Sequence, residues 1–213
     1  MRLATDADIP AIVDVYIRAY AQPPWLERHE PISSEGYLRW VMGQPGTFCL
    51  VSVPASAPAS LPVSAPATVS VSVSGAPPDA GPVQGMVLAG PRAYADFVSD
   101  WERLADRPLD GWPPVPGQLG YIWEIAVVPE AQRRGQGSAL LRGAVERMRA
   151  GGADAVVLRS SERATAAVGM YRRFGFRRLP VTERIDPQSG PWLLRLEAPP
   201  PAPDGAAAGE PGR

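Results

Sequence analysis

The chain has 213 residues, 45% of them hydrophobic and 20% charged, which is enough for one large domain with a hydrophobic core. A formal net charge of −1 argues against a strongly basic nucleic-acid-binding protein. The single cysteine, Cys49, excludes an intrachain disulfide, and a single histidine, His29, makes a zinc site unexpected. No segment approaches the roughly 18 apolar residues of a membrane span, and the N-terminus has no apolar signal core. We therefore expect a cytoplasmic protein without a metal or a membrane partner.

The first elements are predicted from capping and periodicity. A short strand over 2–4 precedes Thr5, which opens a helix through a capping box with Asp8. An apolar stripe at helical spacing continues from there to Tyr20. Pro23-Pro24 ends that helix. Ser33 is the predicted N-cap of a second helix, which runs through Met42, and a strand follows over 47–53.

Two insertions are predicted in the middle of the chain. Residues 54–82 consist mostly of Ala, Pro, Ser and Val, a composition that predicts a mobile loop inserted in a hairpin. Valine and serine alternate over 68–74, which leaves open a strand extension there. A strand returns over 83–89, and a second, helical insertion covers 91–117. Its apolar residues recur at helical spacing: Tyr94, Phe97, Val98, Trp101 and Leu104.

The last part of the chain alternates strands and helices. The expected elements are a strand over 119–128, a helix over 137–149, a strand over 155–158, a helix over 164–174 ended by Gly175, and strands over 176–181 and 192–196. The strand–helix–strand unit near 119–158 implies a parallel pair of strands at the centre of an α/β sheet.

The segment with the most chemical information is 132–137, which reads Gln-Arg-Arg-Gly-Gln-Gly between a buried strand and a helix. A helix N-terminus and nearby backbone N–H groups suit a phosphate or pyrophosphate. Gly135 and Gly137 lack the side chains that would block such a ligand, and Arg133 and Arg134 add positive charge. The glycines alone are equally typical of a plain strand–helix turn.

The whole segment resembles the GCN5-related N-acetyltransferase (GNAT) family. Residues 132–137 match its Q/R-x-x-G-x-G/A signature, and a second family signature stands at Tyr171-Arg172-Arg173-Phe174-Gly175-Phe176. The resemblance implies the acyl-CoA N-acyltransferase fold, a mixed and mostly antiparallel sheet with helices on both faces. We expect this domain over 1–197, followed by a disordered tail over 198–213.

The resemblance also implies acetyl-CoA as co-substrate and a primary amine as acceptor. A splay between the strand at 119–128 and the strand at 155–158 would admit the thioester, and an N–H near Ile125 or Val127 would stabilise the oxyanion. By carry-over, the following residues would bind the pantetheine arm and the pyrophosphate: Ile125, Ala126, Val127, Gln132, Arg133, Arg134, Gly135, Gln136, Gly137 and Ser138.

Two residues are candidates for proton transfer. Glu124, the only acidic residue inside the apolar strand, is the candidate base, or else an edge-facing or salt-bridged residue. Tyr171 is the candidate acid, or else a core residue of an amphipathic helix. The family often has Asn seven residues before this tyrosine, where this chain has Ala164. Nearby Ser160, Ser161 or Thr165 substitutes for that contact, or it is absent.

The acceptor itself is not predicted. It is a small-molecule or peptide amine, and a homodimer is possible by analogy with the family. His29 is either a base in the acceptor pocket or a solvated loop residue, and Glu27 and Glu30 attract a cationic amine or are simply solvated. Aromatic residues that would line an acceptor site are Trp25, Tyr37, Trp40, Trp112 and Trp123. The alternatives to an enzyme are a non-catalytic acyl-CoA-sensing module and an interaction protein that uses 54–82.

Overall fold

A seven-stranded sheet organises the computed structural model, which describes residues 1–54, 81–115, 117–183, 185–186 and 188–196. The strands are β1 (Arg2–Leu3), β2 (Phe48–Ser52), β3 (Gly85–Arg92), β4 (Gln118–Val127), β5 (Ala153–Ser161), β6 (Arg177–Arg178) and β7 (Ser189–Arg195). The helices are α1 (Ile9–Tyr20), α2 (Pro31–Met42), α3 (Tyr94–Ala105), α4 (Gln136–Ala150) and α5 (Thr165–Phe174). None of the helices in the described ranges is long and apolar enough to cross a bilayer.

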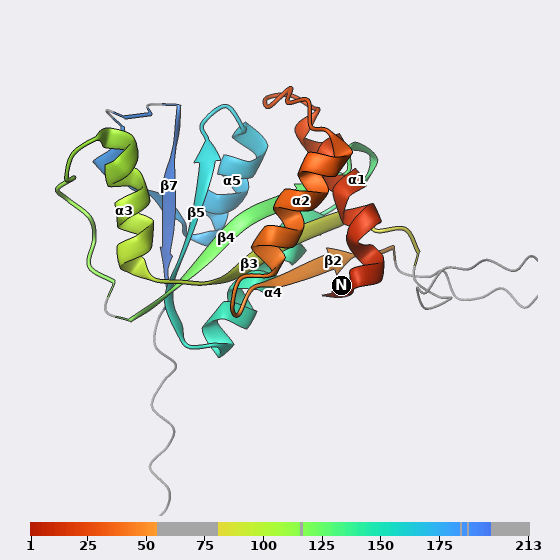
Figure 1. The fold of residues 1–213 in the computed structure, drawn as a ribbon, viewed down its shortest axis with the longest axis horizontal. Helices are drawn as coiled ribbons and strands as arrows, with labels where there is room; N and C mark the ends of the chain where they lie inside the picture. The colour runs from red at the N-terminus through yellow and green to blue at the C-terminus, as the bar shows by residue number, and fades with distance from the viewer. Residues whose placement is uncertain (55–80, 116, 184, 187, 197–213) are drawn as a thin grey trace, which may run out of the picture.

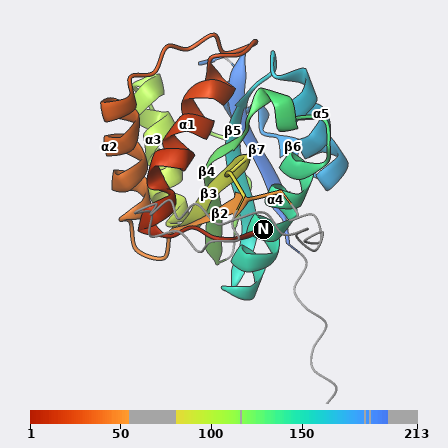
Figure 2. The same cartoon turned by 90° about the vertical axis from the view of Figure 1, so that its right-hand side faces the viewer.

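The strand order is β1-β2-β3-β4-β5-β7-β6, and β4–β5 is the one parallel pair among the described strands (Figure 1). The expected mixed sheet with a central parallel pair is therefore confirmed. Figure 2 shows three layers, with α1, α2 and α3 on one face of the sheet and α4 and α5 on the other. This arrangement follows from the α4 crossover between β4 and β5, because a parallel pair needs a long connection that returns over one face.

The entry into α1 forms as predicted. The Thr5 backbone N–H and hydroxyl both donate to the Asp8 carboxylate, at 2.8 and 2.9 Å, and close the capping box. The N-cap predicted for α2 is wrong, because the helix begins at Pro31 rather than after Ser33. Proline fits the first turn, where no N–H partner is needed, and it keeps Glu30 extended. Ser34 donates instead from inside the helix to the Glu30 carbonyl.

The C-terminal strands differ from the prediction at one point. Only Arg177 and Arg178 of the expected strand 176–181 pair with β7. Pro180 has no N–H for the ladder and instead starts a short 3₁₀ turn, Pro180–Thr182. Gly175 ends α5 as predicted, and it does so in the left-handed conformation with φ 95°.

The helix predicted within 91–117 is present as α3. Phe97 and Trp101 are buried against β4, β5 and β7, whereas Leu104 of the expected apolar stripe is 61% exposed. Most of the other predicted insertion, including the 68–74 alternation, lies outside the described residues, and so does the tail from 198.

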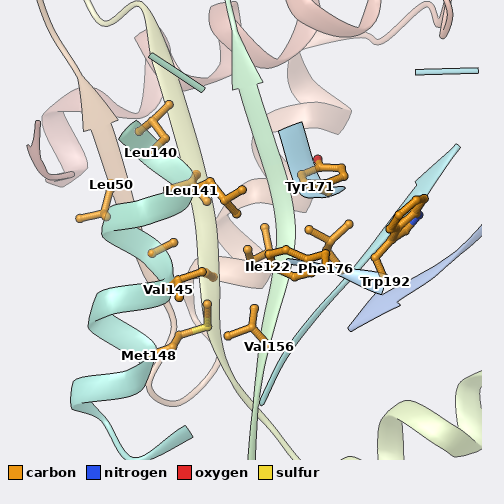
Figure 3. Packing of buried hydrophobic residues seen from close by; sticks show 14 of the residues in the cluster. Leu50, Ile122, Leu140, Leu141, Val145, Met148, Val156, Tyr171, Phe176 and Trp192 are labelled. Atoms are coloured by element: carbon orange, nitrogen blue, oxygen red, sulfur yellow. The ribbon is translucent and has the colours of Figure 1, made fainter. Parts of the chain in front are cut away.

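The main core lies between the sheet and the helices α4 and α5. Leu141 and Val145 of α4 point toward the sheet, while Tyr171 and Trp192 close the far end of the same cluster (Figure 3). A second cluster joins the sheet to α1 and α2, and a third joins it to α3. Helices therefore cover both faces of the sheet. The parallel ladder between β4 and β5 is the one that ends before its two strands do.

Candidate active site

The parallel ladder between β4 and β5 stops before either strand does. Its last paired residues are Ile122 and Leu158, although β4 continues to Val127 and β5 to Ser161. Figure 1 shows the two strands fanning apart beyond this point. A cleft of about 890 Å³ lies there, lined by both strands, the end of α1 and the first turns of α4 and α5. The splay expected from the family resemblance is therefore present.

The peptide groups of β4 that face this gap can be identified from the ladder. Val128 donates its N–H to the Gln84 carbonyl, on the β3 side. Since successive peptide groups of a strand alternate in direction, the N–H groups of Ile125 and Val127 point away from β3, into the gap. The Val127 carbonyl accepts a hydrogen bond at 3.0 Å from the Gln132 side chain, which also lines the cleft. The gap thus exposes unpaired backbone donors beside a buried surface.

A β-bulge at Trp123 decides where Glu124 lies. In the β3–β4 ladder Leu88 pairs with Glu124 and Ala89 with Ile122, so Trp123 is the extra residue. Strict alternation would place Glu124 on the same face as Ile122, which packs with α4 and α5. The extra residue reverses the alternation, and Glu124 points instead to the face of α1 and α2.

On that face, Glu124 accepts hydrogen bonds from two tyrosines, and within the described ranges no cation forms a salt bridge with it. Its Oε2 accepts from the Tyr20 hydroxyl at 2.5 Å, and its Oε1 accepts from the Tyr37 hydroxyl at 2.7 Å. Burial raises the pKa of the Glu124 carboxyl above its ordinary value, while the two tyrosine hydrogen bonds hold that pKa down. Among the described residues Glu124 therefore has tyrosine hydrogen bonds and no salt bridge, and burial favours its protonated form more than water does.

The opposite wall is built by the start of α4. Gly135 is the N-cap with φ 81°, a left-handed conformation that favours glycine, and no side chain caps the helix. The first N–H groups of α4 therefore have no partner within the described residues. A Cβ on Gly135 would meet no atom within 4 Å, and one on Gly137 would meet only Met170 and Val127 side chains. Both glycines border open cleft rather than packed core.

The charge of the lining is uniformly positive. Aspartate and glutamate are absent from it, as far as the described residues reach, and α5 adds a second uncapped helix N-terminus at Ala164. The basic residues of the lining are Arg133, Arg159, Arg163 and Arg173. Such a wall favours a ligand that carries several negative charges.

Not every predicted cofactor residue faces the cleft. Those that line it are Ile125, Ala126, Val127, Gln132, Arg133, Gly135, Gly137 and Ser138. Arg134 is exposed and lies outside the lining. The Gln136 amide turns toward the sheet and bonds Ser52 and Gln84, at 2.9 and 2.8 Å, so only its backbone stands at the loop.

Tyr171 and Ala164 also meet at the cleft. Tyr171 is only 4% exposed, packs on Phe176 and Trp192, and still contributes to the lining. Its hydroxyl has no hydrogen-bond partner among the described residues. Burial and the charge of Glu124 raise the pKa of this phenol, so it stays protonated. Ala164 is buried at the same wall, beside Thr165 and Ser160, which supply the polar atoms there.

The loop between α1 and α2 covers the Glu124 side of the cleft. His29 is partly exposed, its ring lies 4.8 Å from the Tyr16 ring, and its Nε2 lies 2.7 Å from a Glu27 oxygen. Of the predicted acceptor aromatics, Trp25 and Trp123 line the cleft. Those that do not line it are Tyr37, which binds Glu124, the exposed Trp40 on α2, and Trp112, which packs on Phe97.

Tyr20 is the site residue that the sequence prediction missed. It is the last residue of α1 and the only titratable side chain that both lines the cleft and contacts Glu124, within the described ranges. Its place at the end of the apolar stripe, directly before Pro23-Pro24, made it look like core. No group of three or more metal-binding side chains occurs among the described residues.

Comparisons with known proteins agree with this geometry. A model of the acetyltransferase (GNAT) family matches residues 91–176, which contain the bulge, the Gly135 loop and Tyr171. A mycothiol acetyltransferase from Arthrobacter sp. (strain FB24) is 36% identical over 72 residues. That match covers 34% of this chain and only 22% of the relative, so it concerns one part of a longer protein.

Solved structures resemble the chain over most of its length. A ribosomal-protein-alanine N-acetyltransferase from Brucella melitensis has a TM-score of 0.57 at 17% identity, covering 92% of this chain and 98% of that one. A putative acetyltransferase from Salmonella typhimurium, solved with acetyl-CoA, has a TM-score of 0.54 at 18% identity, covering 96% and 97%. At identities this low, the similarity to these two structures shows a shared fold and nothing more. The chain therefore shares its fold with these acetyltransferases over most of its length, and the part that forms the cleft matches the GNAT family model.

Proposed function

We propose that this chain is an acetyl-CoA-dependent N-acetyltransferase that acts on a primary amine. The observation that carries the proposal is the pairing of two unlike walls across the splay of β4 and β5. One wall offers helix N-termini, glycines and arginines, and the other offers the Glu124–Tyr20 pair. The first wall suits an anionic acyl carrier, and the second wall suits proton transfer. The same cleft therefore offers both of the functions that acetyl transfer needs.

The residues of the first wall fit acetyl-CoA. The free N–H groups at the start of α4, next to Arg133, would bind the pyrophosphate, and the open space at Gly135 and Gly137 leaves room for it. The N–H groups of Ile125 and Val127 would bind the pantetheine arm and the thioester oxygen. When bound there, acetyl-CoA supplies the activated acetyl group.

Glu124 would remove the proton of the amine through Tyr20. An ammonium ion has no lone pair, so the amine must lose a proton before or during its attack on the carbonyl carbon. Glu124 is not itself in the lining, but the Tyr20 hydroxyl is, and it already donates to the carboxylate at 2.5 Å. The hydroxyl oxygen can accept the amine proton while the tyrosine proton passes to Glu124.

Tyr171 would protonate the departing thiolate. It enters the cleft from α5, on the opposite face of the sheet from Glu124, and its free hydroxyl is held in the protonated form by burial. An acid on one side and a base on the other suit a reaction in which one sulfur leaves as one nitrogen attacks. The phenol would then be reprotonated from solvent.

Calorimetric titration with acetyl-CoA tests the first wall. We expect binding by the unaltered protein and its loss in Gly137→Glu, because the new carboxylate would occupy the cleft next to the helix N-terminus. Gly36→Glu is the matched control, since Gly36 is also helical, is exposed on α2, and has no atom within 4 Å that an added Cβ would meet.

Release of CoA thiol with a panel of primary amines tests the second wall. Amine-dependent release supports the enzyme. Tight binding of acetyl-CoA without any transfer would indicate the acyl-CoA-sensing alternative instead. Equal binding by the Gly137→Glu and Gly36→Glu variants would contradict the assignment of the wall.

A further inference from the structure

A second cavity, of about 400 Å³, lies on the α3 side of the sheet next to the cleft. It is formed by α3 together with the ends of β3, β4 and β5, and its floor is aromatic, with Trp101 and Tyr121. Arg159 of β5 lines both this cavity and the cleft. The two spaces therefore meet at one side chain, at the point where β4 and β5 separate.

The arginines of this cavity are held against aromatic rings. The Arg92 guanidinium carbon lies 4.9 Å from the Tyr121 ring centre, and that of Arg159 lies 5.1 Å from the Trp101 ring centre. A guanidinium that stacks on a ring presents its N–H edge sideways, where Arg92 donates to Asp100, and Arg159 donates to Ser189 and Asp186. The rings thus hold the two cations, and the N–H groups that these bonds do not use can donate to a planar anion.

Acidic partners do not neutralise the cavity fully. Asp100 is the one acidic residue of the lining, and Arg92 and Arg103 share it. Arg159 is paired with Asp186 at 3.1 Å, from outside the lining. One positive charge is therefore in excess around a space with aromatic walls, which favours an anionic group on an apolar spacer.

The cavity and the proposed base, Glu124, lie along the same face of β4. Tyr121 and Trp123 lie on the same face of β4 as Glu124, with their ring centres 5.0 Å apart. Three residues of a bulged strand separate Tyr121 from Glu124, which corresponds to roughly 7 to 10 Å. An extended acceptor lying along these rings would place its amine at Tyr20 and its far end between Arg92 and Arg159.

We propose that this cavity, here called the arginine subsite (Arg92, Arg159, Trp101 and Tyr121), binds an anionic group of the acceptor. The preferred acceptor is a primary amine that carries a carboxylate or a phosphate several bonds away. This inference rests on the proposed acetyl transfer, which it extends to the class of acceptor. Carboxylate and phosphate share the chemistry that two guanidiniums recognise, so the experiment separates them.

The test compares primary amines with the same number of carbons. Aminohexanoate, aminohexyl phosphate and the uncharged aminohexanamide are each acetylated by the full chain, and kcat/KM is measured. We expect one of the anionic amines to exceed the amide about tenfold or more, through KM, as charge-assisted hydrogen bonds predict. Arg92→Gln should abolish this preference, because it removes one of the two guanidiniums of the subsite.

Arg149→Gln is the matched control, because it removes the same charge from an exposed position on α4. Equal kcat/KM for the charged and uncharged amines would overturn the subsite, and so would an equal loss of preference in the two variants. Failure to acetylate any amine would count against the proposed function instead. Calorimetric binding of aminohexanoate or aminohexyl phosphate then tests the subsite alone: weaker binding to Arg92→Gln supports it, and equal or no binding overturns it.

Discussion

Asp8 and Glu124 are both withdrawn from solvent, but the two regions around them treat the negative charge in opposite ways. At the corner of β1 and α1, the Asp8 carboxylate lies against Arg2, with contacts of 2.6 and 2.7 Å, and accepts from Thr5. At the bulge of β4, Glu124 meets only tyrosine hydroxyls. The Arg2 guanidinium holds the pKa of Asp8 well below its usual range, whereas burial raises the pKa of Glu124.

This contrast separates a carboxylate that stabilises the fold from one that is suited to take a proton. A cation and two hydrogen bonds fix Asp8 in its charged form. Because these interactions exist only in the folded state, they increase the free energy of unfolding. Phenols satisfy both oxygens of Glu124 without supplying a positive charge, so the carboxylate remains costly to keep ionised. Glu124, the carboxylate with the weaker electrostatic compensation, is also the one beside the gap between β4 and β5.

The largest expected effect is on activity, from Glu124→Gln. The amide keeps the shape, and its one oxygen can still accept from one tyrosine while its NH2 donates to the hydroxyl oxygen of the other, but it cannot take a proton. We expect kcat for acetyl transfer to fall by about 10²–10⁴, measured as CoA thiol release. Stability in urea should stay equal or increase, because a poorly compensated buried charge is removed.

Glu130→Gln is the control, since Glu130 is exposed and paired with Arg18 on the surface. A variant at Glu124 that kept the activity of the unaltered chain, with the control also unaffected, would remove this residue from the proton path.

Asp8→Asn should have the opposite profile. We expect a loss of about 2–3 kcal/mol in the free energy of unfolding at pH 7, because Arg2 is left without its partner and the capping box is weakened. Activity of the folded fraction should not change. Because the folded-state pKa of Asp8 is depressed, its contribution is complete above the ordinary pKa of the carboxyl and disappears as the pH falls through the folded value.

Urea unfolding at a series of pH values measures this difference. Asp14→Asn is the control, because its pair with Arg18 is exposed and should change stability by less than about 0.5 kcal/mol. A destabilisation of Asp8→Asn that stayed constant down to low pH would show that packing, rather than charge, makes the contribution.

The sequence predicts the Asp8 region better than the Glu124 region, for a physical reason. The capping box uses residues three positions apart, and its geometry is local. The partners of Glu124 come from α1 and α2, 104 and 87 positions away along the chain. A bulge that no composition signal marks also moves Glu124 to their face. Periodicity therefore predicts each element but not which elements meet at this carboxylate.

The same distinction applies to the glycine loop. Its position between strand and helix follows from the order Gln132 to Gly137, and the structure places α4 there. The side chain of Gln136 nevertheless turns toward β2 and β3, because Ser52 and Gln84 offer it hydrogen bonds that sequence spacing does not reveal. Backbone features of the site were thus predictable, and side-chain directions were not.

Tyr20→Phe separates the two possible routes of the proton. If Glu124 acts through the Tyr20 hydroxyl, kcat should fall about tenfold or more, while acetyl-CoA binding stays the same. Tyr16→Phe is the matched control, because Tyr16 is a neighbouring tyrosine of α1 that has no hydrogen bond to Glu124. Unchanged turnover in Tyr20→Phe would indicate that the amine reaches the carboxylate by another route.

Tyr37→Phe should give the smallest effect, a shift in the pH profile. Tyr37 lies outside the cleft lining and only donates to the Glu124 carboxylate, which holds its raised pKa down. Removing the hydroxyl raises that pKa further, because the carboxylate loses a hydrogen bond that favours its charged form. The acid limb of kcat/KM should therefore move to higher pH, and the rates of the two proteins should converge at alkaline pH, where Glu124 is ionised in both. A profile lowered by the same factor at every pH would mean that Tyr37 positions the substrate rather than tuning the base.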